Sequence, residues 1–162
     1  MRLFQLQTAQ VLDCALKEAW EFFSSPGNLP LITPPWLNLR PVTELPKTMH
    51  EGLIIAYRVR PFLHIPMTWV TEITHVNELR FFVDEQRVGP YRLWHHEHRF
   101  EEVSGGVQMS DHITYALPLD PISRLIHKWI IAPQLRNLFE YRRTAVERLF
   151  GRSADDSKFN WH

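Results

Sequence analysis

YRLWHHEHRFEEVSGGVQMSDHITYALP (residues 91–118) is the stretch that decides the fold. Its two halves alternate apolar and polar residues, which is the period of a β-strand, and the SGG at 104–106 has the composition of a tight turn. The stretch therefore predicts an antiparallel hairpin. A tight turn would place His98 opposite Asp111 across the two strands.

Further strand patterns come before this hairpin. Most of the links between them are short, which favours antiparallel neighbours. The predicted strands cover residues 2–12, 36–44, 51–60, 66–76 and 79–86. After the first of these, Asp13 is placed to cap a helix, ALKEAWEFF, which the SSPG at 24–27 ends.

The sequence after the hairpin is helical. Asp120 is a candidate cap, Pro121 suits a first turn, and apolar residues recur at helical spacing to residue 150. Pro133 has no N–H and must kink or restart this helix. A long amphipathic helix that follows an antiparallel sheet buries its apolar stripe on that sheet. The predicted class is α+β, a curved antiparallel sheet wrapped around a long C-terminal helix, with a cavity between them.

Length and composition narrow the classes of function. The 162 residues fit one domain, which we expect over residues 1–151, followed by a disordered tail over 152–162. A formal net charge of zero gives no global field toward nucleic acid. The single cysteine, Cys14, excludes an internal disulfide and is interpreted as a small packed side chain. No apolar run has the length of a membrane span or signal peptide, so we expect a cytoplasmic protein without stable membrane insertion.

Polar residues interrupt the inward face of the predicted hairpin. Trp94, His96 and His98 share one face of the first strand, and Asp111 and Tyr115 share the facing side of the second. Two neighbouring polar residues, Asp84 and Gln86, could join them. The sequence does not decide which face of the strand Asp84 and Gln86 occupy, because the preceding LRFFV (residues 79–83) is apolar on both faces.

Three interpretations of this cluster compete. It is a buried hydrogen-bond network, or a site that fixes the polar end of a ligand, or a site of chemistry. In the third case His96, His98 and Asp111 are candidate acid and base groups, and two histidines with an aspartate also match a mononuclear metal site. A His-x-His pair on a strand is a weak metal signal, and we expect no metal and no cofactor.

Other aromatic, histidine and basic residues are interpreted as core, cavity-wall or solvent-exposed positions. Trp69 is either cavity wall or plain core, and two further tryptophans pack the opening helices. The basic residues of the last helix are interpreted as a solvated face. The two tryptophans are Trp20 and Trp36. The basic residues of the last helix are Arg136, Arg142, Arg143 and Arg148. Four histidines are expected to be exposed, namely His50, His64, His75 and His127.

The polar and glycine positions also carry a resemblance that spans nearly the whole chain. The matching residues are Asp84, Gln86, Gly89, Pro90, Trp94, His96, His98, Phe100, Asp111, Tyr115 and Pro118, then Phe139, Tyr141 and Arg142. With this pattern the sequence resembles the SRPBCC (START/Bet v 1-like) superfamily, in its bacterial single-domain ligand-binding branch. The resemblance implies a helix-grip fold. The superfamily includes lipid carriers, hormone receptors, polyketide aromatase/cyclases and stress proteins, so the fold does not fix the activity. The sheet-to-helix link LPLDPIS lacks a glycine that members often have there.

We therefore expect a protein that binds or carries an apolar or amphipathic small molecule, lipid-like or polyketide-like. The alternative is a small aromatase/cyclase- or dehydratase-like enzyme that uses His96, His98 and Asp111 in the same cavity. A third class, a protein-interaction module, rests only on the exposed helix and tail. The expected partner is a hydrophobic small molecule and not nucleic acid, while the oligomeric state cannot be inferred. The expected ligand-binding residues are Trp69, Asp84, Trp94, His96, His98, Met109, Asp111 and Tyr115.

Overall fold

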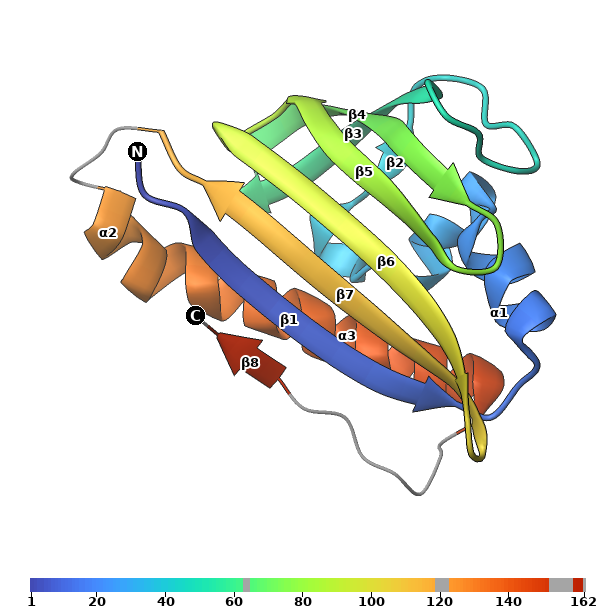
Figure 1. Ribbon diagram of the computed structural model, residues 1–162. Helices are drawn as coiled ribbons and strands as arrows, with labels where there is room; N and C mark the ends of the chain where they lie inside the picture. Colours follow the sequence, from blue (N-terminus) through green and yellow to red (C-terminus); the bar gives the residue numbers. More distant parts are fainter. Residues whose placement is uncertain (63–64, 119–122, 152–158, 162) are drawn as a thin grey trace.

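In the part of the chain that the structure describes, eight antiparallel strands form one sheet in the order β2-β3-β4-β5-β6-β7-β1-β8 (Figure 1). The computed structural model describes residues 1–62, 65–118, 123–151 and 159–161. The strands are β1 (Phe4–Leu12), β2 (Arg40–Pro41), β3 (Ile54–Phe62), β4 (Ile65–Asn77), β5 (Phe81–Val88), β6 (Leu93–Val103), β7 (Gly106–Ala116) and β8 (Phe159–Trp161). Consecutive strands pair from β2 to β7, and β1 then adds to the far side of β7. The predicted α+β class with a curved antiparallel sheet is confirmed.

The β6–β7 hairpin has the predicted register. His98 pairs with Asp111, and the ladder runs to Val103 opposite Gly106. Gly106 has φ +136, and a Cβ there would lie 1.9 Å from the carbonyl oxygen of Leu12. Only glycine allows this close approach of the turn to the end of β1, so the turn also fixes how the hairpin meets β1.

Three short helices follow β1 and cover one end of the sheet. They are α1 (Leu16–Phe23) and two 3₁₀ helices, η1 (Pro26–Ile32) and η2 (Pro35–Leu37). Two predictions were wrong here. The N-cap is Ala15 and not Asp13, and the strand expected over 36–44 is reduced to the two residues of β2. The prolines before Trp36 fix backbone angles that suit a 3₁₀ turn and delay the strand.

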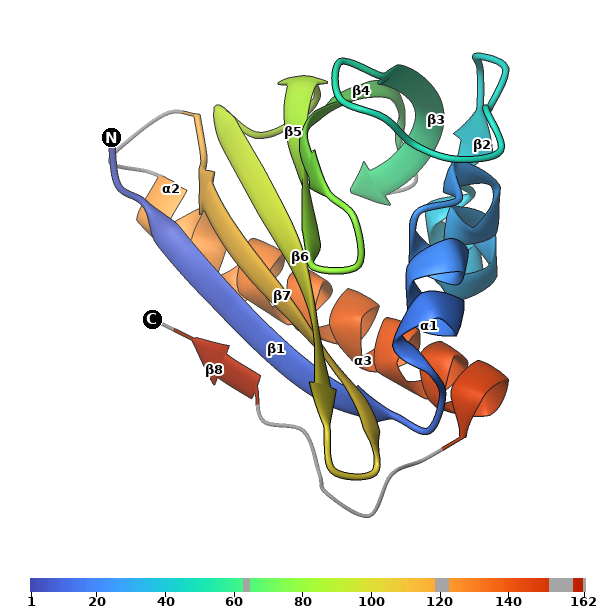
Figure 2. The same ribbon diagram turned by 45° about the vertical axis from the view of Figure 1, so that its right-hand side comes forward.

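The C-terminal helix crosses the concave side of the sheet, as Figure 2 shows. It consists of α2 (Ser123–Ile126), a π-helical turn η3 (His127–Ile131) and α3 (Ala132–Phe150). Pro133 sits in the first turn of α3, directly after the wide π turn. The predicted irregularity at Pro133 thus takes the form of a π turn, which accommodates a residue that cannot donate a backbone hydrogen bond. The predicted cap at Asp120 and Pro121 lies outside the described residues.

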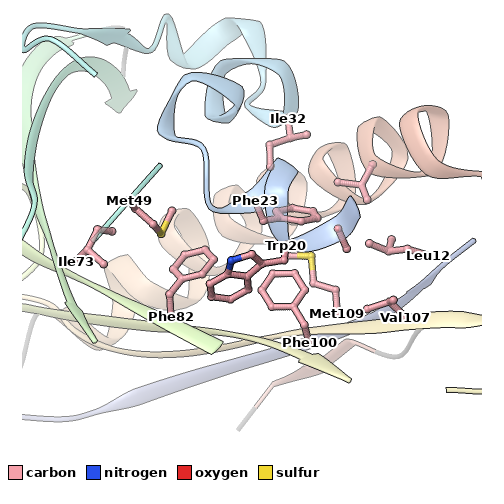
Figure 3. Packing of buried hydrophobic residues seen from close by; sticks show 12 residues of the cluster. Leu12, Trp20, Phe23, Ile32, Met49, Ile73, Phe82, Phe100, Val107 and Met109 are labelled. Carbon is pink, nitrogen blue, oxygen red and sulfur yellow. The ribbon is translucent and has the colours of Figure 1, made fainter. Parts of the chain in front are cut away.

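Apolar clusters hold the helices to the sheet, and two of them involve α1 and α3. The first joins α1 to the β5–β7 region: Trp20 packs edge-on against Phe82 and Phe100, with ring centroids 6.1 and 5.7 Å apart (Figure 3). The second joins Leu135 and Phe139 of α3 to the aromatic residues of β6 and β7. The predicted core position of Trp20 is confirmed. Among the described helices, none combines the length and apolar character needed to cross a bilayer.

Part of the predicted tail has a defined place. Phe159–Trp161 form β8 and pair with Leu6–Thr8 of β1, next to the N-terminal strand in Figure 1. The remaining tail positions, 152–158 and 162, lie outside the described residues. The domain boundary after residue 151 stays a prediction.

Candidate functional site

A cavity of about 260 Å³ lies between the sheet and α3. Its walls come from η1 and η2, from strands β3 to β6, and from the buried side of α3. Trp36, half exposed on η2, lines the cavity and packs edge-on against Tyr141 of α3, with ring centroids 5.4 Å apart. This corrects the prediction that Trp36 packs the opening helices, and it places an aromatic side chain where the cavity reaches the surface.

One wall of the cavity is aromatic. Trp69 of β4 lies edge-on to Trp94 of β6 and to Tyr91, at centroid distances of 5.6 and 5.8 Å. Tyr91 packs against Trp94 at 4.7 Å. Such pairs bury large apolar area in fixed geometry. Burial raises the pKa of Tyr91 well above its usual range, so its hydroxyl stays neutral.

The polar part of the wall is a closed arrangement of four side chains, which we call the Asp–His ring: Asp84, His96, Asp111 and His98. His96 Nε2 lies 2.9 Å from Asp111 Oδ1, and His98 Nε2 lies 3.1 Å from Asp84 Oδ2, both with hydrogen-bond geometry. The other two nitrogens complete the ring, His96 Nδ1 at 3.3 Å from Asp84 Oδ2 and His98 Nδ1 at 3.0 Å from Asp111 Oδ1. Each imidazole therefore lies between two carboxylates. His98 Nδ1 makes its close contact without hydrogen-bond geometry.

Two threonine hydroxyls contact the carboxylate oxygens that do not face the imidazoles. Thr8 of β1 donates its hydroxyl to Asp111 Oδ2 at 3.1 Å. The Thr71 hydroxyl lies 3.4 Å from Asp84 Oδ1 and 3.2 Å from the carbonyl oxygen of Glu85, so it shares one proton between them. The ring's carboxylate oxygens are thus already engaged within the fold.

The electrostatics of the ring favour its ionised form. Burial alone would raise the pKa of Asp84, but the charges and hydrogen bonds of His96 and His98 outweigh it and hold this pKa well below its usual range. Burial would also raise the pKa of Asp111, but its hydrogen bonds to the two imidazoles outweigh burial and lower this pKa. Burial would lower the pKa of His96, but Asp84 and Asp111 raise it overall. Within the ring, Asp84, Asp111 and His96 are therefore a buried set of opposite charges.

Three members of the ring form a possible ligand set for a metal ion. Asp84, His96 and His98 each offer a ligand atom within 4.8 Å of the others. Ligand atoms around a tetrahedral zinc lie roughly 3.4 Å apart for bonds of about 2.1 Å. Asp84 Oδ2 lies at a similar 3.3 Å from His96 Nδ1 and 3.1 Å from His98 Nε2. The imidazole nitrogens already face carboxylate oxygens at 2.9 to 3.3 Å. The expectation of a metal-free site stays a prediction.

The cavity brings together five of the eight expected ligand-binding residues: Trp69, Asp84, Trp94, His96 and His98. Asp111 lies behind the imidazoles and lines, with Met109, only a second cavity of about 20 Å³. Tyr115 lines neither cavity, and its hydroxyl lies 2.7 Å from Nε2 of His127.

His127 differs from its expected position, and the structure also places Gln86, whose side of the strand was left open. His127 was expected to be exposed, but it is half-buried and stacks on Phe4 at a centroid distance of 3.7 Å. Burial and the charge of Arg2 lower its pKa, so the imidazole is neutral and accepts a hydrogen bond from the Tyr115 hydroxyl. Gln86 bonds the backbone of Tyr91 and braces the β5–β6 turn, away from the ring. His64 lies outside the described residues.

Sequence reasoning missed Arg142. It was interpreted as part of a solvated basic face, yet its side chain lines both cavities and its Nε is buried. Its guanidinium lies 5.1 Å from the ring centre of Phe139. A signal was present: Leu135, Phe139, Arg142 and Val146 recur at helical spacing, which puts the arginine on the buried stripe of α3.

A curved antiparallel sheet closed by a C-terminal helix around an apolar cavity defines the START/Bet v 1-like class of helix-grip proteins. The chain belongs to the polyketide cyclase / dehydrase and lipid transport family, whose model matches residues 12–139. The predicted superfamily is therefore confirmed. This membership supports hydrophobic ligand binding or a cyclase-like role as the general function.

Solved structures share the fold at low sequence identity. Protein CV1439 from Chromobacterium violaceum superposes with a TM-score of 0.69 at 9% identity, over 92% of this chain and 99% of that chain. Ara h 8.0201 has a TM-score of 0.60 at 10% identity, over 91% and 99%. The di-domain ARO/CYC StfQ of the steffimycin biosynthetic pathway has a TM-score of 0.65 at 10% identity, over 91% of this chain and 52% of that chain. No curated protein matches the sequence.

Proposed function

We propose that the protein binds or carries an apolar or amphipathic small molecule, lipid-like or polyketide-like, in the cavity between sheet and α3. The observation that carries the proposal is a cavity of about 260 Å³ whose aromatic wall, with Trp69 and Trp94, adjoins the imidazoles of the Asp–His ring. Sites for small molecules have this character, with mostly apolar walls and a few fixed polar groups. A structural core would instead be filled to close-packed density.

A cavity-filling variant tests the proposal. Leu138 lines the cavity from α3 and is partly buried, whereas Leu149 on the same helix is 50% exposed. Wild type should bind the neutral dye Nile red with enhanced fluorescence. Leu138→Trp should lose most of that binding because the indole occupies the ligand's space, and Leu149→Trp should bind like wild type. A folded wild type that binds no dye, or equal binding by all three proteins, contradicts the proposal.

The alternative function is a small cyclase- or dehydratase-like enzyme. His96 favours it, because this imidazole lines the cavity and its raised pKa, with burial outweighed by Asp84 and Asp111, keeps a proton available for general acid catalysis. Against it, both nitrogens of His96 already face carboxylates, so proton transfer to a ligand requires one of these contacts to open.

One experiment separates the two functions. The protein is purified from its own host, and native mass spectrometry identifies a copurified small molecule. That compound is then incubated with fresh protein and followed by liquid chromatography with mass spectrometry, which also separates isomers of equal mass. An unchanged compound supports the carrier. Loss of water, or formation of a cyclised isomer, that is abolished in His96→Gln supports the enzyme.

A further inference from the structure

Arg142 presents a positive charge to the cavity without an acceptor for it. In the described part of the chain, its buried Nε has no hydrogen-bond partner. The stacking contact with Phe139 satisfies the face of the guanidinium but none of its N–H groups. A buried cation without a partner is costly, so an acceptor from outside the protein would stabilise it.

The nearest carboxylates are engaged elsewhere. Asp111 directs Oδ1 to the two imidazoles and Oδ2 to Thr8. Asp84 directs Oδ2 to the same imidazoles and Oδ1 to the shared hydroxyl of Thr71. Both aspartates act on Arg142 through space, yet neither is hydrogen-bonded to its Nε.

The imidazoles next to Arg142 already face the carboxylates of the Asp–His ring. Every ring nitrogen of His96 and His98 faces a carboxylate oxygen within 3.3 Å. These contacts engage the imidazoles with the two aspartates, so neither ring is well placed to donate to a ligand. The guanidinium beside them, whose Nε has no partner among the described residues, is the donor that is left available.

We propose that Arg142 anchors a carboxylate on the ligand, so that the preferred occupants of the cavity are apolar molecules ending in one ionised acid group. This inference rests on the proposed binding function and specifies its ligand class. The planar guanidinium forms paired, charge-assisted hydrogen bonds with a carboxylate. The neighbouring cavity of about 20 Å³ has room for about one water molecule, which could bond Nε but could not neutralise the charge.

Two probes of equal length and different end groups test the assignment. Decanoate and decanol are compared as displacers of Nile red from wild type, from Arg142→Gln and from Arg148→Gln. Arg148 is exposed on the same helix and serves as the matched control. Wild type and Arg148→Gln should bind decanoate more tightly than decanol. Arg142→Gln should lose about tenfold to one-hundredfold in decanoate affinity, the usual worth of a charge-assisted hydrogen bond, and keep its decanol affinity.

The outcomes are distinguishable. If Nile red binds but decanoate and decanol displace it equally, or Arg142→Gln weakens both probes alike, the carboxylate assignment is wrong and the binding function stands. If folded wild type binds neither dye nor probe, the proposed function fails and the assignment fails with it.

A measurement on wild type covers the case in which Arg142→Gln does not fold. Decanoate labelled with ¹³C at its carboxyl group is followed by NMR from about pH 7 to pH 5, where a free carboxylic acid begins to take up its proton. The carboxyl signal of the bound probe should keep the shift of the ionised form, because the guanidinium stabilises the charge. A bound signal that moves with pH like the free probe overturns the assignment.

Discussion

Asp111 lies directly opposite His98 in the β6–β7 ladder, yet its hydrogen bond goes to His96 on the diagonal. The same oxygen, Oδ1, lies 2.9 Å from His96 Nε2 and 3.0 Å from His98 Nδ1. One carboxylate thus holds two imidazoles whose ring centres are 3.8 Å apart. The two rings are tilted by 39°, and the carboxylates of Asp111 from behind and Asp84 from the cavity side stabilise their close approach.

Removing the charge of Asp111 should therefore be costly. We expect Asp111→Asn to lower the free energy of unfolding by about 3–5 kcal/mol, because it leaves buried imidazolium charge uncompensated. Asp84→Asn should cost less, since the Asp84 side chain is 19% exposed and its place can be hydrated from the cavity. Urea unfolding measures both, with Asp13→Asn at an exposed position as control. Equal losses for the two variants would contradict this account.

The ring also predicts how stability depends on pH. The pKa values of Asp84 and Asp111 are lowered because the imidazoles outweigh burial. The stability that this contributes is present above the pKa of an unfolded aspartate, about 3.9, and is lost as pH falls. The raised pKa of His96, where the carboxylates outweigh burial, contributes stability that is present below about 6.5 and lost as pH rises. The ring should therefore stabilise the fold most between about pH 4 and pH 6.5.

Thermal unfolding across pH checks this window. The difference in stability between wild type and His96→Gln should be largest inside it and shrink on both sides. His75→Gln, at an exposed position, is the matched control and should follow wild type. A difference that grows toward alkaline pH would mean that His96 is neutral in the folded protein.

Strict alternation made much of the ring predictable. Trp94, His96 and His98 share the buried face of β6, and the short turn brought Asp111 opposite His98. Asp84 could not be placed, because its strand is apolar on both sides and β4 shifts register twice along it. Its inward position follows from pairing with His96, which the local sequence does not encode.

Two of the residues misplaced from the sequence differ in the cause of the error. The position of one depends on long-range packing, and the charged neighbours of the other suggested an exposed face. Arg142 has the spacing of the buried stripe of α3, but the many charged residues around it suggested a solvated face. His127 meets Tyr115 and Phe4 only because α2 and η3 fold back beside the ends of β1 and β7. No local pattern indicates that contact.

The turn that sets the ring's register depends on one glycine. Gly106→Ala should destabilise the protein by at least about 1–3 kcal/mol, the usual cost of a strained backbone conformation, with a further penalty from the clash with Leu12. Gly27→Ala is the control, because a Cβ there meets only Ser25 Oγ at 4.0 Å. Chemical unfolding compares the two. An unchanged midpoint for Gly106→Ala would contradict the tight approach of the turn to β1.

Elemental analysis tests the expectation of a metal-free ring. We expect iron, zinc and manganese well below one ion per chain in protein purified without chelator, because the ring nitrogens face carboxylates and Arg142 adds a positive charge beside them. Near-stoichiometric metal that is lost in His98→Ala would show instead that the cluster coordinates an ion.

The last prediction separates cavity wall from core with two aromatic residues. Trp69 lines the cavity and is only partly buried, whereas Phe100 is 5% exposed, lies outside the cavity lining and packs against Trp20, Phe23 and Phe82. Phe139 is unsuitable as the core reference because it also lines the cavity.

Truncating a packed aromatic costs about 3–5 kcal/mol, since it removes contacts and leaves a void. Phe100→Ala should lose that much in urea unfolding. Trp69→Ala should lose clearly less, because part of the indole already faces open space, while its affinity for Nile red falls. Equal destabilisation by both variants, with unchanged dye binding by Trp69→Ala, would mean that the aromatic wall belongs to the core and that the ligand space lies elsewhere.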